Sequence, residues 1–229
     1  MKLNFSYYHH IKKVDINGIS KDVIQAATDG DVFMIYSRGS KYYKSLDDID
    51  EVHVSNDTTL QQDFYQMVHK SNVARFDVKT IDDGKLYNDL MDLIPEEIIQ
   101  IETPVCSLLN IHSGQEILPH VDKGRRTAIN LYISGDEGSV VKFHETTVPI
   151  PEFNVHSRKN LNDSSKDAKL KMFLDYDNLK TIAKFEPSIG DMYMLDVSKI
   201  HSVNNLRESS IRVVVSYNFR KKFDELCVV

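Results

Sequence analysis

The chain has 229 residues, of which 41% are hydrophobic, so it is long enough for one globular domain, or one domain with a sizeable extension, to bury a core. Its formal net charge of −6 at pH 7 argues against nonspecific binding to nucleic-acid phosphates. No apolar run is long enough to cross a membrane, and the first residues lack the apolar stretch of a signal peptide, so no membrane association is predicted and the cytoplasm is the expected compartment.

Residues 1–100 read as a mixed α/β region without a chemical signature, and we expect its elements to flank the core of the protein. Short β-branched and aromatic runs predict strands, whereas apolar residues at helical spacing predict helices. The predicted strands are Asp31–Tyr36 and Glu51–Val54, and the predicted helices are Leu60–His69 and Lys85–Leu93, the second ending near Pro95.

From Glu102 onward the sequence changes to closely spaced, alternating segments separated by turn residues, a pattern typical of antiparallel barrels and sandwiches. Eight strands are predicted there: Pro104–His112, Glu116–Asp122, Thr127–Ile133, Val140–His144, Thr181–Glu186, Met192–Val197, His201–Asn204 and Ile211–Phe219. Eight such strands can build a jelly roll, also called a double-stranded β-helix. The expected fold class is therefore mainly β with flanking helices (α+β), with a jelly-roll core at residues 101–220.

Residues 149–180 interrupt the strand pattern, because they are polar and too numerous for a hairpin turn. We predict a mobile insertion here, with a short helix at Lys166–Leu174, that could cover the mouth of the barrel. Residues 221–229 follow the last strand as a C-terminal tail, and the basic stretch Arg220–Lys222 at its start is expected to be solvated.

A candidate metal site combines the pair His120-x-Asp122 with His201. In an extended strand, side chains two positions apart share a face, so the His120 imidazole and the Asp122 carboxylate can reach one ion. His201, on a neighbouring predicted strand, supplies a third ligand. Two histidines and one carboxylate on one side of an octahedral ion are the ligand set of non-haem Fe(II) oxygenases, and the opposite positions stay open for chemistry. We therefore predict that these three residues bind iron and are catalytic.

The last predicted strand carries Arg212 on the face expected to line the barrel. In Ile211–Phe219 the odd positions are apolar, whereas Arg212 lies on the other face. If the apolar face packs against helices, Arg212 points into the barrel, where a buried cation needs an anion. The alternative is an arginine that points to solvent or pairs with a structural acid.

Four further residues are candidates for substrate contacts. In Thr127–Ile133 the same alternation places Asn130 and Tyr132 on one polar face, which lines a pocket or, alternatively, is solvated. Arg125 and Arg126 closely follow the metal-binding pair and could meet an acidic substrate or co-substrate. The alternative for both arginines is an exposed turn.

Several motifs in roughly residues 102 to 219 match one known pattern: Asn110-x-His112-x-Gly114, His120-x-Asp122, the segment Pro187–Asp196 leading into His201, and Arg212 beyond it. In these motifs the chain resembles the Fe(II)- and 2-oxoglutarate-dependent dioxygenases of the double-stranded β-helix type. The resemblance implies an enzyme with Fe(II) as cofactor, 2-oxoglutarate and O2 as co-substrates, and ascorbate as a supporting reductant. It also implies that Arg212 binds the far carboxylate of 2-oxoglutarate, which suits the planar fork of a guanidinium.

Three more residues are co-substrate candidates by this resemblance. His112 stands where related enzymes often have a tyrosine that hydrogen-bonds the co-substrate, and Asn110 could do likewise; a satisfied core histidine is the alternative for His112. The familiar Arg-x-Ser arrangement is absent, because position 214 is valine, and Ser216 could replace that hydroxyl.

The closest likeness, in Leu118–Asp122 and the Gly190-Asp191 turn, is to the prolyl and aspartyl/asparaginyl hydroxylases, which implies hydroxylation of an amino-acid residue in a peptide or protein. The alternatives are an oxygenase acting on a free amino acid or another small metabolite, and a cupin-like metal-binding protein without oxygenase activity. Oxidative demethylation of nucleic acids uses the same triad, but the acidic balance and the absence of an arginine- and aromatic-rich groove argue against a nucleic-acid partner. The sequence sets no oligomeric state.

Overall fold

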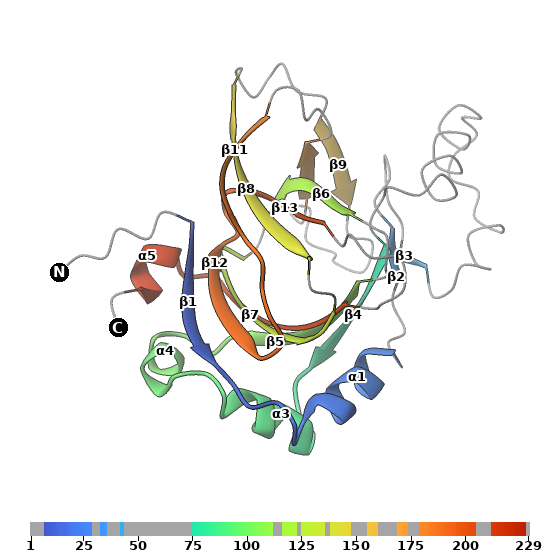
Figure 1. Ribbon diagram of the computed structural model, residues 1–229, viewed down its shortest axis with the longest axis vertical. Coiled ribbons are helices and arrows are strands. Elements are labelled where there is room, and N and C mark those ends of the chain that lie inside the picture. The colour runs from blue at the N-terminus through green and yellow to red at the C-terminus, as the bar shows by residue number, and fades with distance from the viewer. Residues whose placement is uncertain are drawn as a thin grey trace.

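The computed structural model contains two antiparallel β-sheets, with short helices packed on the outside of the larger one (Figure 1). It describes residues 7–28, 33–35, 42–43, 75–111, 116–122, 125–135, 138–147, 155–159, 169–173, 179–204 and 212–227. The predicted strand Glu51–Val54 and the predicted helix Leu60–His69 lie outside these residues. None of the helices in the described ranges has the length and apolar content needed to span a membrane.

Each of the eight predicted core strands has a counterpart in the structure. They are β5 (Val105–Ile111), β6 (Glu116–Val121), β7 (Thr127–Ser134), β8 (Val140–Thr146), β11 (Leu179–Phe185), β12 (Asp191–Asp196), β13 (Ile200–Asn204) and β14 (Arg212–Phe219). The larger sheet contains the order β12-β7-β14-β5 and the smaller sheet the order β11-β8-β13-β6. Successive core strands cross between the sheets at every step except β8 to β11, which is the connectivity of a double-stranded β-helix. The predicted fold class is therefore confirmed.

The larger sheet is extended on both sides by elements from the N-terminal region. Strand β1 (Tyr8–Lys13) pairs with β12, whereas β4 (Arg75–Ile81), β2 (Phe33–Ile35) and β3 (Tyr42–Tyr43) continue the sheet beyond β5. Helices α1 (Ser20–Thr28), α3 (Gly84–Met91) and α4 (Glu96–Ile101) lie along the outer face of this sheet (Figure 1). The described N-terminal elements therefore extend and cover the larger sheet, and α3 and β2 correspond to the predicted helix Lys85–Leu93 and the predicted strand Asp31–Tyr36.

The helix predicted at Lys166–Leu174 is wrong, because this part of the insertion contains strand β10 (Lys169–Phe173). Strand β10 pairs with β9 (Val155–Lys159) and with β6, so both strands extend the smaller sheet. The segment Lys169–Phe173 alternates basic and apolar residues, which is a strand pattern, and the open edge of β6 supplies hydrogen-bonding partners for it. Met172 is aligned with His120, so the insertion reaches the strand that carries the first residue of the predicted metal-binding pair.

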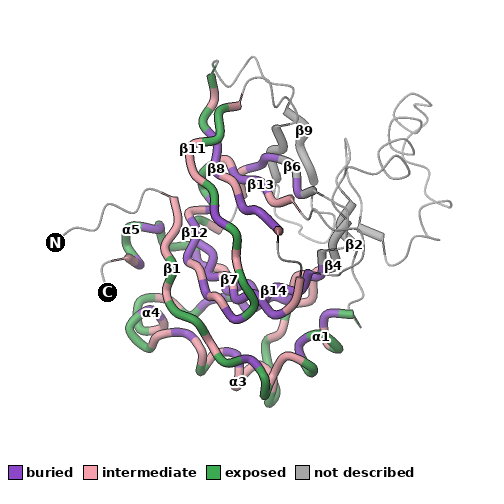
Figure 2. The backbone as a smooth tube through the Cα atoms, viewed as in Figure 1, coloured by how far each residue is buried: buried purple, intermediate pink, exposed green. Residues whose placement is uncertain are grey.

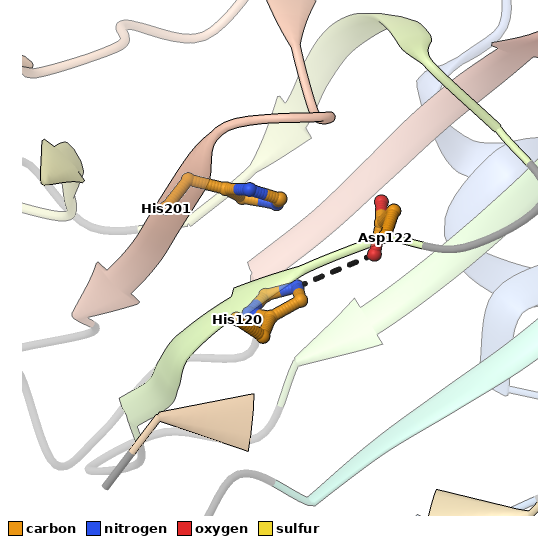
Figure 3. A group of neighbouring side chains, drawn as sticks. All are labelled: His120, Asp122 and His201. Carbon is orange, nitrogen blue, oxygen red and sulfur yellow. Dashed lines mark ion pairs between the residues drawn. The ribbon is translucent and has the colours of Figure 1, made fainter. Parts of the chain in front are cut away.

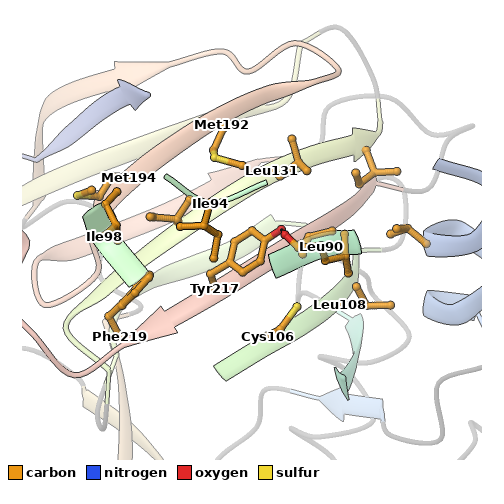
Figure 4. Close-up of a cluster of buried hydrophobic side chains, with 14 of the residues drawn as sticks. Leu90, Ile94, Ile98, Cys106, Leu108, Leu131, Met192, Met194, Tyr217 and Phe219 are labelled. Atoms are coloured by element: carbon orange, nitrogen blue, oxygen red, sulfur yellow. The ribbon is translucent and has the colours of Figure 1, made fainter. Parts of the chain in front are cut away.

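Apolar side chains fill the space between the larger sheet and its helices (Figure 4). Leu90 of α3 and Ile98 of α4 pack with Tyr217 and Phe219 of β14, and the Tyr217 hydroxyl donates a hydrogen bond of 2.7 Å to the Leu90 carbonyl. A second apolar cluster, which includes Phe143, lies between the two sheets. Figure 2 shows the resulting burial along β7 and β14, the central strands of the larger sheet.

The tail also contributes to the core. The basic stretch Arg220–Lys222 is exposed, as predicted, but helix α5 (Phe223–Leu226) follows it directly. Phe223 and Leu226 are buried in the cluster between the sheet and its helices.

Gly190 lies in the turn just before β12, where the backbone packs closely against the residue that follows β1. Its φ is +84°, and a Cβ atom there would lie 2.5 Å from the Val14 carbonyl oxygen. We expect Gly190→Ala to lower the free energy of unfolding by about 1–3 kcal/mol from backbone strain, plus the cost of this clash. Chemical denaturation measures the loss. Gly84→Ala is the control, because Gly84 has a φ of +83° and nothing within 4 Å, and an equal loss in both variants would contradict the clash.

Candidate metal centre

His120, Asp122 and His201 converge at one point between the sheets (Figure 3). Strands β6 and β13 are antiparallel neighbours in which His120 and His201 are aligned, and side chains aligned in this way lie side by side on one face. The two ring centroids are 4.2 Å apart. Asp122, two positions after His120, brings its Oδ1 within 3.5 Å of His120 Nε2. One ligand atom from each residue lies within 4.8 Å of the others, which is close enough for a single ion to bind all three.

The protonation of His201 and Asp122 also suits a metal. The Nδ1 atom of His201 lies 2.9 Å from the Lys199 carbonyl, which only accepts hydrogen bonds, so Nδ1 carries the proton and Nε2 presents its lone pair. Burial, reinforced by His120, lowers the pKa of His201 to about 4, which keeps the ring neutral at pH 7. Burial alone would raise the pKa of Asp122. The charge of Arg125, together with both histidines, outweighs the effect of burial, so the pKa falls below its usual value.

His144 and Glu145 are near in sequence to a strand end but do not join the triad. His144 Nε2 lies 2.9 Å from Ser202 Oγ, and its Nδ1 lies 3.2 Å from Thr181 Oγ1, so both ring nitrogens have protein partners. Glu145 is exposed and accepts a hydrogen bond of 3.0 Å from the Tyr7 hydroxyl. Among the described residues, the triad is the one group of side chains placed to share a metal.

Arg212 begins β14 and points into the space between the sheets, as the strand pattern predicts. Its exposed fraction is 2%, and its Nε and Nη1 atoms have no hydrogen-bond partner within the described structure. The guanidinium carbon lies 4.9 Å from the centre of the Tyr132 ring. Burial lowers the pKa of Arg212 although Tyr132 opposes the shift. A buried guanidinium with unused donors is a ready site for an anion.

A cavity between the sheets connects the triad to Arg212. Most of its walls are apolar, with polar groups concentrated near the triad and Arg212. The lining residues are Leu109, Ile117, His120, Arg125, Ala128, Asn130, Val141, Leu195, Val197, His201, Val203, Arg212 and Val214. A ligand in this cavity could therefore contact the metal ligands and the buried guanidinium together.

Only some of the other predicted site residues line this cavity. Asn130 lines it, whereas Tyr132 is buried beside Arg212 and lines a second, smaller hollow behind it. Asn110 is buried on β5, and Ser216 is buried on β14. His112 falls outside the described residues, and Arg126 is exposed. Their roles toward substrate or co-substrate stay predictions.

Arg125 is partly buried and is held by side-chain contacts rather than lying free in an exposed turn. Its Nε donates a hydrogen bond of 2.5 Å to Asp122 Oδ2, and its Nη1 contacts Asn218 Oδ1 and Ser216 Oγ. The charge of Arg125 is therefore already balanced by Asp122, and a contact with an anionic substrate stays a prediction. Sequence reasoning assigned no role to Asn218, although the alternation in β14 places it on the same face as Arg212.

Gly135 makes room for Arg212. Its φ is +138°, and an added Cβ would lie 3.0 Å from Arg212 Cγ. We expect Gly135→Ala to displace the guanidinium and to weaken the binding of a dicarboxylate probe such as 2-oxoglutarate, by up to about 100-fold for a shift near 1 Å, with metal binding unchanged. Calorimetric titration of the metal-loaded protein measures both. The control is Gly138→Ala, with a φ of +113° and nothing within 4 Å, and equal weakening in both variants would exclude a specific effect on Arg212.

Comparisons with known proteins give similarity in structure only. No protein-family model matches the chain, and no curated protein matches it. Among solved structures, ycfD from Escherichia coli has 12% sequence identity and a TM-score of 0.48, over 94% of this chain and 50% of that one. Another structure, of the Escherichia coli ribosomal oxygenase YcfD, has 11% identity and a TM-score of 0.42, over 92% of this chain and 45% of that one. This chain thus spans about half the length of the ycfD chains.

A third similar structure is vicilin from hazelnut (Corylus avellana), with 14% identity and a TM-score of 0.34 over 64% of this chain and 28% of that one. We assign the fold from the strand order of the two sheets, and we assign the candidate site from the side chains of this chain. The protein is a double-stranded β-helix with a candidate metal centre, formed by two histidines and one aspartate, in the cavity between its sheets.

Proposed function

We propose that this protein is an Fe(II)- and 2-oxoglutarate-dependent oxygenase that hydroxylates an amino-acid residue in a peptide or protein. The observation that carries the proposal is one cavity lined by both histidines of the triad and by Arg212, whose buried guanidinium has unused donors. The triad alone would suit several metal-binding functions. A buried cation with unused donors in the same cavity specifically favours an anionic co-substrate that also reaches the metal.

The donor set fits Fe(II). Two neutral imidazoles and one carboxylate suit this ion, and because all three ligands come from one side, they leave coordination positions open. When bound, Fe(II) with 2-oxoglutarate and O2 supplies the oxidising chemistry that inserts oxygen into a C–H bond. The chain contributes the ligands His120, Asp122 and His201.

The remaining groups orient the co-substrate and exclude water. Arg212 would bind the far carboxylate of 2-oxoglutarate by charge-assisted hydrogen bonds from its unused Nε and Nη1 donors. Tyr132 packs against the guanidinium, and Gly135 leaves space for its side chain, so the orientation of Arg212 is set before the ligand arrives. Apolar residues such as Val141, Leu195 and Val214 line the same cavity, and they would limit access of water to the reacting groups.

The substrate class rests on the sequence resemblance of Leu118–Asp122 and the Gly190-Asp191 turn to amino-acid-residue hydroxylases. A free amino acid or small metabolite is the competing class. Incubation of the Fe(II)-loaded enzyme, 2-oxoglutarate and ascorbate with a peptide library and, separately, with free amino acids distinguishes the two by mass spectrometry. A peptide that gains one oxygen supports the proposed class, and oxygen incorporated only into free amino acids contradicts it.

The proposed cofactor requirement is tested by titrating 2-oxoglutarate without oxygen into the wild-type protein, with and without Fe(II). We expect tight binding only when the metal is present, because the 2-oxo acid end is bound by the metal and the other end by Arg212. Binding of 2-oxoglutarate that is equally strong without metal, or absent from the Fe(II)-loaded protein, would contradict the proposed function.

A further inference from the structure

We propose that Arg125 is a positioning residue that fixes the Asp122 carboxylate so that Oδ1 alone faces the metal. The inference rests on the proposed metal centre and adds to it a residue that acts through a ligand rather than on the ion. Arg125 lies outside the triad, and its contacts span both sheets.

The two oxygens of Asp122 have different surroundings. Oδ2 accepts the 2.5 Å hydrogen bond from Arg125 Nε, whereas Oδ1 lies 3.5 Å from His120 Nε2. The Asp122 side chain is only 6% exposed, so water does not compete strongly for Oδ2. A carboxylate whose second oxygen is bound by a guanidinium can offer one oxygen to an ion, which keeps further coordination positions open for other ligands.

The guanidinium is itself anchored on the opposite sheet. Arg125 Nη1 donates to Asn218 Oδ1 and, at 3.4 Å, to Ser216 Oγ, both on β14. The Asn218 amide donates in turn to Ser107 Oγ at 3.3 Å and to the Val105 carbonyl at 3.2 Å, both on β5. A chain of hydrogen bonds therefore runs from the metal-ligating carboxylate, at the end of β6 in the smaller sheet, to the two strands of the larger sheet that carry Ser107 and Asn218.

The backbone next to Arg125 is held by β14 and by the turn that follows β12. The Arg126 amide donates a hydrogen bond of 2.9 Å to the Phe219 carbonyl, and the Arg126 carbonyl accepts one of 3.3 Å from the Ser198 amide. The Asp122 amide donates to the Val197 carbonyl at 3.0 Å. Asp122 and the residue that follows Arg125 are thus fixed by backbone contacts, so protein groups organise the pair.

Cobalt(II) provides the test, because its affinity can be measured by calorimetry and its visible absorption responds to the number and arrangement of ligands. We expect Arg125→Ala to weaken Co(II) binding by about 10- to 100-fold, the usual effect of removing a partner of a metal ligand. We also expect its Co(II) spectrum to change, because Oδ2 is then free to approach the ion. Arg125→Lys keeps a cation near Oδ2 but not the fork to Asn218, so it should restore part of the affinity.

Arg220→Ala is the matched control, because this arginine is exposed and is not a site candidate, and its Co(II) affinity and spectrum should equal those of the wild type. Asn218→Ala removes the anchor of the guanidinium and should change the spectrum in the same direction as Arg125→Ala, which keeps the test valid if the Arg125 variant does not fold. If Arg125→Ala has the Co(II) affinity and spectrum of the wild type, the inference about Arg125 is wrong, but the metal centre is not affected. If only Asn218→Ala folds, the same result in that variant overturns the inference. Failure of the wild type to bind Co(II) would overturn the metal centre as well.

Discussion

Replacing Arg212 with methionine is expected to weaken the binding of 2-oxoglutarate to the Fe(II)-loaded protein by about 30- to 3,000-fold. Removal of one partner of a buried, hydrogen-bonded charge pair costs about 2–5 kcal/mol, and each 1.4 kcal/mol is a factor of ten. Arg212 is buried, so solvent screens this interaction weakly. Fe(II) affinity should be unchanged, because Arg212 is not one of the ligands. Anaerobic calorimetry measures both affinities.

A second ligand makes this test specific for the far carboxylate. 2-Oxobutyrate has the 2-oxo acid end but lacks the second carboxylate, so it should bind the wild type and Arg212→Met with the same weak affinity. If Arg212→Met binds 2-oxoglutarate as tightly as the wild type does, the carboxylate site lies elsewhere. An equal loss for both ligands would instead show that the substitution disturbs the metal end of the cavity.

The same substitution should stabilise the protein in the absence of ligand. The guanidinium of Arg212 is desolvated, and its Nε and Nη1 have no partner among the described residues, so its burial costs free energy. Methionine fills similar volume without a charge, and replacements of buried charges by apolar residues are often stabilising by about 1–4 kcal/mol. Chemical denaturation of the ligand-free proteins tests this, and a marked loss of stability would indicate that Arg212 is structural.

Asp122→Ala is expected to weaken Fe(II) binding by more than the roughly 10- to 100-fold loss that follows removal of a supporting residue, because it removes a ligand itself. Asp122 is also the only carboxylate of the triad, and its low pKa keeps it charged at neutral pH. Equilibrium titration with Fe(II) under anaerobic conditions, or with Co(II) in air, measures the loss.

Two variants control this prediction. Glu145→Ala removes an exposed carboxylate from a strand end and should leave metal affinity unchanged. Asp122→Asn keeps the shape of the side chain but not its charge, so it should retain the folded structure and still bind metal weakly. Full metal affinity in Asp122→Ala would exclude this residue as a ligand and, with it, the assignment of the triad.

The sequence predicted the core strands and the convergence of the triad side chains because both depend on alternation. Residues that alternate along β14 separate the apolar face, with Tyr217, from the face that carries Arg212, and one buried sheet fixes that register. His120 and Asp122 share a face for the same reason. His201 could be added because a third ligand was needed from a neighbouring strand, and β13 does pair with β6.

Other features could not be predicted because their signal is weak or not local. Strand β1 is an edge strand with the sequence Tyr-His-His-Ile-Lys-Lys, which lacks clear alternation. Helix α1 buries only Val23 and Ala27, too few for a recognisable apolar stripe. The contact between Arg125 and Asn218 joins residues 93 positions apart, and only the closure of the two sheets brings them together.

The most direct test of the central claim is succinate formation from 2-oxoglutarate by the purified protein with Fe(II), ascorbate and air, with no added substrate. We expect slow turnover in the wild type and none in His201→Ala, because His201 is a proposed metal ligand whose Nδ1 is occupied by the Lys199 carbonyl, which leaves Nε2 for the ion. Turnover that is equal in the two proteins would show that the triad is not the catalytic centre. Failure of the wild type both to form succinate and to bind 2-oxoglutarate with Fe(II) present would contradict the oxygenase function.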